Sequence, residues 1–171
     1  MVMLVATSLY YNLIVLDRRA RATNQVVSSL SFAMDTMARG IRTGYDYQCT
    51  TTGGNDTTGN CTSFSYSDTV LKTRVTYIKK ASGSIGRCQG TPGNYSNLSC
   101  LDASASPLTD PGITIAKLSF YVRGVGNSAA PTWAQQPHVT FVISGRIPAG
   151  SKGEVVPFTI QEGATQRLLD Y

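Results

Sequence analysis

The sequence has no proline before Pro92 and no glycine before Gly40. These two residue types interrupt helices, so nothing breaks a helix that runs from near Met1 to about Thr43, roughly 65 Å in length. Charge is also scarce: charged residues make up 15% of the chain, and the cations behind the net charge of +5 are scattered after the first fifty residues. This pattern is too diffuse for the basic surface of a nucleic-acid-binding protein.

Catalytic motifs are missing as well. The chain has one histidine, His138, and it contains no nucleophile elbow, phosphate-binding loop or two-histidine metal spacing. No pair of carboxylates stands out as acid and base, so we expect a protein that is not an enzyme. Asn55-Asp56, Asp102 and Asp110 could supply oxygens to calcium, but they lack the dense spacing of a dedicated loop. We therefore expect no cofactor, with calcium as the weaker alternative.

The first sixteen residues carry only three polar side chains, Thr7, Ser8 and Asn12. As a helix they would extend ~24 Å, short of the ~30 Å hydrocarbon core of a membrane. The segment has neither the basic start nor the cleavage site of a secretory signal, and it is apolar on every face, so lipid or other helices must cover it. We expect it to be the outer part of a transmembrane segment that begins upstream. Its expected assembly face comprises Leu4, Val5, Leu9, Leu13 and Leu16.

The helix changes character at Asp17-Arg18-Arg19-Ala20-Arg21. Beyond that point apolar residues recur at three- and four-residue steps, which is typical of an amphipathic helix with one buried face. The residues expected to pack on a sheet are Val27, Leu30, Met34, Met37 and Ile41. This division predicts a protruding apolar helix over residues 1–25 and a globular domain over residues 26–171.

After Thr50 the pattern indicates strands and loops. The segments rich in Val, Ile, Thr, Phe or Tyr are Ser63–Ser67, Val70–Lys79, Ile113–Arg123, His138–Arg146 and Val155–Glu162. A change of phase near Lys117 indicates a bulge, and residues 86–111 show no strand pattern. The sequence therefore predicts an α+β fold, in which the half-helix packs on a single antiparallel sheet.

Cys49 and Cys61 lie twelve positions apart, and so do Cys88 and Cys100. These spacings do not match a zinc knuckle, and polar loops separate the members of each pair. Three connectivities are open, of which proximity favours Cys49–Cys61 with Cys88–Cys100. The alternative is four free thiols in a cytosolic protein, but cysteines flanked by Asn, Thr and Gly suit an oxidising compartment better. Arg18, Arg19 and Arg21 would ordinarily favour the cytoplasmic side, and we follow the cysteines in placing the domain outside.

The stretch RRARATNQVVSSLSFAMDTMARGIRTG, residues 18–44, resembles the exposed half-helix of type IV pilin-like proteins, especially bacterial pseudopilins. The segments Gln136-Pro137-His138-Val139-Thr140, Phe158-Thr159-Ile160-Gln161 and Thr165–Asp170 are similar to late segments of the same family. The leader glycine, the Phe-Thr-Leu after it and the glutamate at the fifth position are absent, and Val5 stands at that nominal position. No processing or methylation site is therefore transferred, and Met1 corresponds to about the second helical turn of the family or later.

The resemblance implies a lollipop-shaped subunit, which leaves the inner membrane and stacks its helix with copies or relatives in a pilus or pseudopilus at the cell surface or in the periplasm. One alternative is a minor or tip pilin that binds a surface or DNA. Its best basic candidates are Lys72, Arg74, Lys79, Lys80 and Arg87. The other alternative is a membrane-tethered exported domain that does not polymerise.

Overall fold

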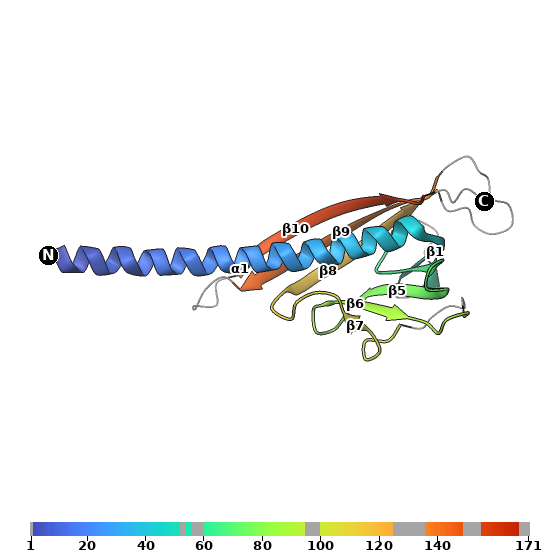
Figure 1. Ribbon diagram of the computed structural model, residues 1–171, viewed down its shortest axis with the longest axis horizontal. Helices are drawn as coiled ribbons and strands as arrows, with labels where there is room; N and C mark the ends of the chain where they lie inside the picture. Colours follow the sequence, from blue (N-terminus) through green and yellow to red (C-terminus); the bar gives the residue numbers. More distant parts are fainter. Residues whose placement is uncertain are drawn as a thin grey trace.

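The computed structural model describes residues 2–51, 54–55, 60–94, 100–124, 136–148 and 155–167. One helix, α1 (Val2–Thr43), precedes all the strands (Figure 1). The described strands are β1 (Gly44–Thr51), β2 (Gly54–Asn55), β3 (Asn60–Cys61), β4 (Ser63–Asp68), β5 (Thr73–Lys79), β6 (Ile85–Gln89), β7 (Ser106–Pro107), β8 (Thr114–Arg123), β9 (His138–Pro148) and β10 (Val155–Thr165).

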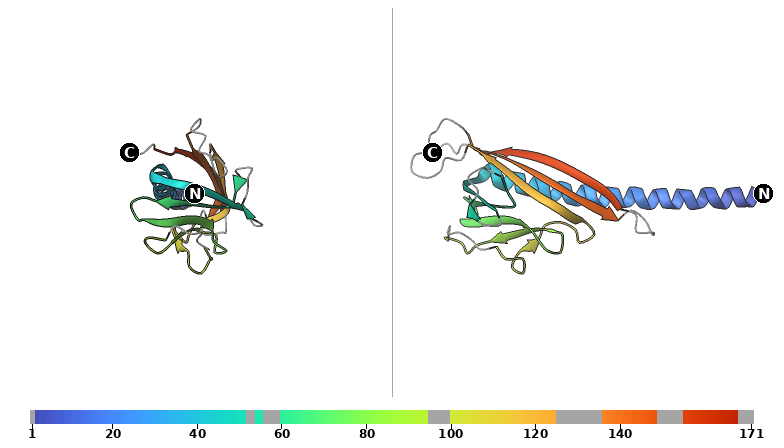
Figure 2. Two further views of the ribbon diagram at one scale, coloured as in Figure 1. Left: turned by 90° about the vertical axis from the view of Figure 1, so that its right-hand side faces the viewer. Right: turned by 180° about the vertical axis from the view of Figure 1, so that it is seen from behind.

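The strands form two antiparallel sheets, so the expectation of one sheet under the helix was wrong. The first sheet has the order β2-β1-β4-β5-β6-β7, and the second has the order β10-β9-β8-β3. Viewed along the helix, the two sheets diverge and α1 lies in the angle between them (Figure 2). The extra strands come from segments without a strand pattern: β1 begins directly after the predicted helix end near Thr43, and β6 and β7 lie in or beside residues 86–111, which show no strand pattern.

The core fills the space between the helix and both sheets. Phe64 of β4 stacks on Phe120 of β8, with ring centroids 5.3 Å apart, and Phe120 contacts Phe141 of β9 at 6.3 Å. These three rings are fully buried and join the two sheets into one hydrophobic core. The expected bulge in β8 is confirmed, because the register with β9 shifts between Ile115 and Lys117. That shift keeps Ile115 and Leu118 on the same buried face.

Three hydrogen bonds hold the C-terminal end of the helix. The Tyr47 hydroxyl donates to the Ile41 carbonyl, Thr69 Oγ1 donates to the Thr43 carbonyl at 3.2 Å, and the Arg167 amide donates to the Arg42 carbonyl at 2.8 Å. The last carbonyls of a helix lack partners inside it, so these contacts satisfy groups that would otherwise be orphaned. They come from β1, from the turn after β4 and from the segment after β10, which fixes the helix to both sheets.

Arg74 of β5, in the first sheet, is the largest fully buried side chain among the described residues. Its guanidinium forms an ion pair with Asp46 and donates to the hydroxyls of Ser65 and Ser67 at 3.2–3.3 Å. It also donates to the Asp46 carbonyl at 2.9 Å. A buried charge is tolerated only when it is paired and hydrogen-bonded, and Arg74 meets that condition. This residue therefore belongs to the interior and not to a basic surface.

The amphipathic half of the helix allows a direct comparison of buried and exposed positions. Leu30 is fully buried, whereas Val27, one turn earlier, is 54% exposed. We expect Leu30→Ala to lower the free energy of unfolding by 2–5 kcal/mol, because it empties a closed part of the core. Val27→Ala serves as the matched control and should change the same free energy by less than about 0.5 kcal/mol in chemical denaturation. Equal effects of the two substitutions would contradict this assignment of the buried face.

Candidate assembly site on the helix

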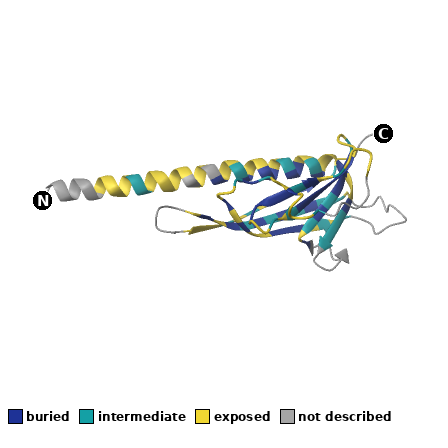
Figure 3. Ribbon diagram, turned by 90° about the horizontal axis from the view of Figure 1, so that it is seen from below, coloured by how far each residue is buried: buried dark blue, intermediate teal, exposed yellow. Residues whose placement is uncertain are grey.

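The helix extends well beyond the sheets, and its N-terminal half touches neither of them (Figure 1). Among the side chains that the structure describes, none is buried between Leu9 and Asn24, and the first buried one is Val26 (Figure 3). Further along the helix, Leu30, Ala33, Met37 and Ile41 are at most 2% exposed. The boundary between the free helix and the part sealed by the domain therefore lies at about Val26.

The free half of the helix carries large apolar side chains. Leu9, Leu13 and Leu16 are 59%, 64% and 59% exposed, and Tyr10 and Tyr11 are exposed as well. At 100° per residue, Leu9, Leu13 and Leu16 share one side of the helix, while the two adjacent tyrosines point to other sides. Complete burial of one such side chain is worth about 1.5–3 kcal/mol. Exposed apolar surfaces are often sites of interaction with another molecule, so this half of the helix is the candidate assembly site.

The free half of the helix makes only weak local contacts of its own. Asp17 and Arg21 form an ion pair at 2.9 Å one turn apart, and Thr23 Oγ1 donates to the Arg19 carbonyl at 2.9 Å. The ion pair contributes only a few tenths of a kcal/mol in water, and a threonine hydroxyl bonded to the carbonyl four residues earlier does not stabilise the helix. Isolated helices are marginal, so the continuous connection to the packed half, beginning at Val26, supplies most of the stability.

The expected assembly and packing residues fall into three groups in the structure. Leu9, Leu13 and Leu16 lie on the free half, and the side chains of Leu4 and Val5 fall outside the described part. Leu30, Met34, Met37 and Ile41 belong to the core cluster. Val27 does not, and its assignment to the packing face was wrong, because its side chain is 54% exposed while that of the adjacent Val26 is buried.

Three exposed aromatic residues were not assigned a role from the sequence alone. Tyr10 and Tyr11 extend the apolar surface around the free half, and Phe32 is 65% exposed on the packed half. Phe32 lies on the side of the helix opposite Leu30 and Met37, so it carries apolar surface along the outside of the domain. The exposure of Phe32 could have been predicted, because its position in the helical pattern lies off the stripe of buried residues.

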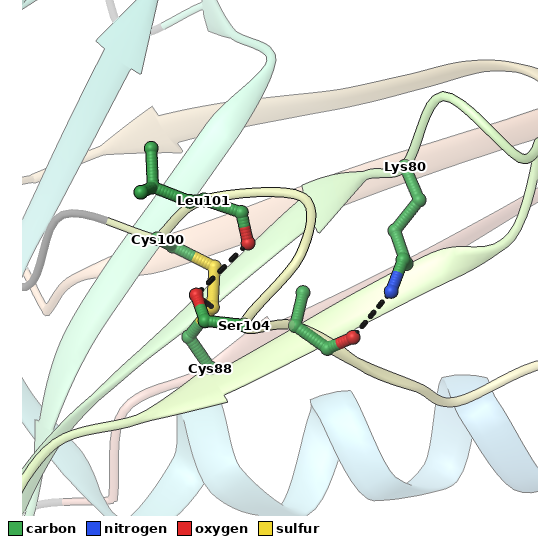
Figure 4. The surroundings of a disulfide bond; sticks show 6 residues. Lys80, Cys88, Cys100, Leu101 and Ser104 are labelled. Atoms are coloured by element: carbon green, nitrogen blue, oxygen red, sulfur yellow. Dashed lines mark hydrogen bonds between the residues drawn. A yellow bond between two sulfur atoms is a disulfide. The ribbon is translucent and has the colours of Figure 1, made fainter.

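Both disulfides have the local pairing favoured by their spacing, which confirms Cys49–Cys61 and Cys88–Cys100. The second closes the connection after β6 (Figure 4). Close to it, Ser104 Oγ donates to the Leu101 carbonyl at 3.0 Å, and Lys80 Nζ donates to the Ala105 carbonyl. Each bridge closes a short loop and restricts the unfolded chain. In the loop-closure model this raises the free energy of unfolding by about 3 kcal/mol.

The structure gives little support to the other two candidate sites, the basic cluster and the calcium-binding carboxylates. Of the proposed basic cluster, Arg74 is buried against Asp46, Lys80 Nζ is bound to a carbonyl, and Arg87 is half-buried. Asp102 and Asp110 accept backbone N–H groups of Ala81 and Gly112, and Asp56 lies outside the described residues. No group of three His, Cys, Asp or Glu side chains suited to a metal ion occurs in the described part of the chain.

The transmembrane segment was also expected from the sequence. Within the described residues, no helix combines the length and the apolar character needed to cross a membrane.

Comparisons with protein-family models, with curated proteins and with solved structures give no significant match to this chain.

Proposed function

We propose that this chain is a structural subunit of an extracytoplasmic filament, of the type IV pilus or pseudopilus kind, and that it assembles through its N-terminal helix. The observation that carries the proposal is the exposed apolar surface of Leu9, Leu13 and Leu16 on a helix that projects beyond the domain. Apolar packing with the same surface of other copies or of related subunits would remove these side chains from water. Before assembly, the same surface would be covered by the inner membrane.

The remaining features support this function in two ways. The two disulfides suit an oxidising compartment outside the cytoplasm. The domain is sealed from Val26 onward by its own core and by contacts at the end of the helix, so it does not need the free half of the helix to fold. A subunit of this design can exchange lipid for neighbouring helices without rearranging its domain.

Removal of residues 1–16 tests this separation of folding from assembly. We expect residues 17–171 to give a disulfide-bonded monomer with one cooperative thermal transition, because every residue of the core cluster is retained. The full chain should self-associate or partition into vesicles under the same conditions. Sedimentation velocity and vesicle flotation measure the two outcomes. If the shortened chain does not fold, the first residues belong to the domain, and if it self-associates as strongly as the full chain, assembly uses another surface.

A further inference from the structure

The outward face of the second sheet carries a groove of about 450 Å³, on the side away from the helix. Tyr121 and Arg123 of β8, His138 and Thr140 of β9, and Gln161 of β10 line it. Alternation along β9 explains this position, since Val139, Phe141 and Ile143 face the core while the residues between them face outward. The volume lies within the range of sites that bind small molecules.

The histidine in this groove is held from two sides. Its Nδ1 lies 3.0 Å from Thr165 Oγ1, and its Nε2 lies 3.1 Å from Thr140 Oγ1. The ring rests beside Gly163 of β10, where a Cβ atom would lie only 3.0 Å from His138 Cε1. The absence of a side chain at Gly163 therefore makes room for the imidazole. Ordering of the ring before binding lowers the entropic cost that a ligand would otherwise have to meet.

The charge of the groove indicates an anionic ligand. Arg123 is its cation, and the side chains that line the groove include no carboxylate. Arg123 is exposed and forms no ion pair with any described residue, and its guanidinium is suited to a planar two-oxygen partner such as a carboxylate. The groove also holds several uncharged hydrogen-bonding groups, namely the Tyr121 hydroxyl, the Thr140 hydroxyl and the Gln161 amide. These groups suit a ligand that is rich in hydroxyls.

We propose that this groove binds a hexuronate, the carboxylate-bearing sugar unit of acidic polysaccharides. Arg123 pairs with the carboxylate, and Thr140 and Gln161 exchange hydrogen bonds with the sugar hydroxyls. Tyr121 supplies an aromatic surface for the C–H groups of the sugar ring. The site is separate from the helix surface used for assembly, so its occupancy does not depend on the filament function.

Titration of the full chain with sodium D-glucuronate tests the proposal, with the chain dispersed in a polyoxyethylene detergent that contains no sugar. His138 is the only histidine, so its ring protons give a single reporter in the NMR spectrum. We expect a saturable shift of these signals, with a Kd of about 1 mM, and at least ten-fold weaker binding of D-glucose. Arg123→Gln should weaken glucuronate binding about ten-fold or more. Arg146→Gln is the matched control, because Arg146 is exposed on β9 outside the groove, and it should bind like the unchanged chain.

Three results would overturn the proposal. The first is the absence of a saturable shift at about 10 mM glucuronate, where a site of the expected affinity would be almost full. The second is equal binding by the Arg123→Gln and Arg146→Gln variants. The third is equally tight binding of inorganic phosphate, which would reduce the groove to a general anion site. Because Arg123 is exposed, its replacement should leave the thermal transition unchanged, and this is measured on the same samples.

Discussion

Gly40→Ala should lower the free energy of unfolding by about 3 kcal/mol, at the upper end of overpacking substitutions in cores. A Cβ atom at Gly40 would lie 2.0 Å from Tyr66 Oη and 2.8 Å from Tyr66 Cζ. Tyr66 cannot move aside easily, because it is 1% exposed and its hydroxyl lies 3.3 Å from that of Tyr77. Burial raises the pKa of both phenols, so both hydroxyls stay protonated and can keep this hydrogen bond. In a solvated helix the same substitution would stabilise by about 1 kcal/mol.

Chemical denaturation of four variants checks this prediction. Arg39→Ala, at the preceding exposed position, should leave the free energy of unfolding nearly unchanged, because its ion pair with Asp35 lies in solvent. Tyr66→Phe removes the oxygen nearest to the added methyl group, so the Gly40→Ala/Tyr66→Phe pair should be more stable than the sum of the single effects by at least about 1 kcal/mol. A stabilising Gly40→Ala, or strict additivity, would mean that the helix does not rest on Tyr66.

Leu13→Asp should abolish self-association of the full chain and leave the domain as stable as before. Leu13 is the most exposed of the three leucines on the free half of the helix and lies outside the core cluster, so its replacement leaves the core of the domain intact. In an assembly the new carboxylate would be placed among apolar helices, where an unpaired charge costs several kcal/mol. The free energy of unfolding should change by less than about 0.5 kcal/mol.

Asn24→Asp is the matched control for this substitution. It adds the same charge to an exposed position on the same helix but removes no apolar surface. Sedimentation velocity after detergent removal should show large species for the control and monomers for Leu13→Asp. Loss of association in both variants would attribute the effect to charge alone, and association of Leu13→Asp would place the interface elsewhere.

Features set by local chemistry were accessible from the sequence. The absence of Gly and Pro placed the helix end near Thr43, the matched spacing of the cysteines favoured the observed disulfides, and the change of phase near Lys117 marked the bulge in β8. Each of these depends on residues close together in the chain.

Features that depend on residues far apart in the chain could not be predicted from the sequence. Strand β6 has little strand character of its own, and it forms because Tyr77 and Ile78 of β5 pair with Arg87 and Gly86. Strand β3 belongs to the second sheet because it pairs with β8, which is distant in the sequence, and not with the neighbouring β4. The burial of Arg74 likewise depends on Asp46, 28 positions away. Propensity yields to tertiary pairing in each case.

Only part of the candidate assembly surface could be predicted from the sequence. Apolar character on all sides identified the free half of the helix, and the helical pattern places Phe32 away from the buried stripe, but the exposure of Val27 does not follow from that pattern. Both residues lie on the half of the helix that the domain covers, and neighbouring positions are fully buried. A helical pattern gives the direction of each side chain but not the edge of the surface that meets it.

Amide hydrogen exchange at residues 9–16 tests most directly whether assembly runs through the free half of the helix. The exchange rates are compared between the chain dispersed in detergent-free dilute solution and the associated chain. If these helices pack together, the amides of residues 9–16 should become strongly protected on association, while the amides of β8, β9 and β10 keep their rates. Fast exchange at residues 9–16 in both states, with new protection on the sheets, would contradict the account.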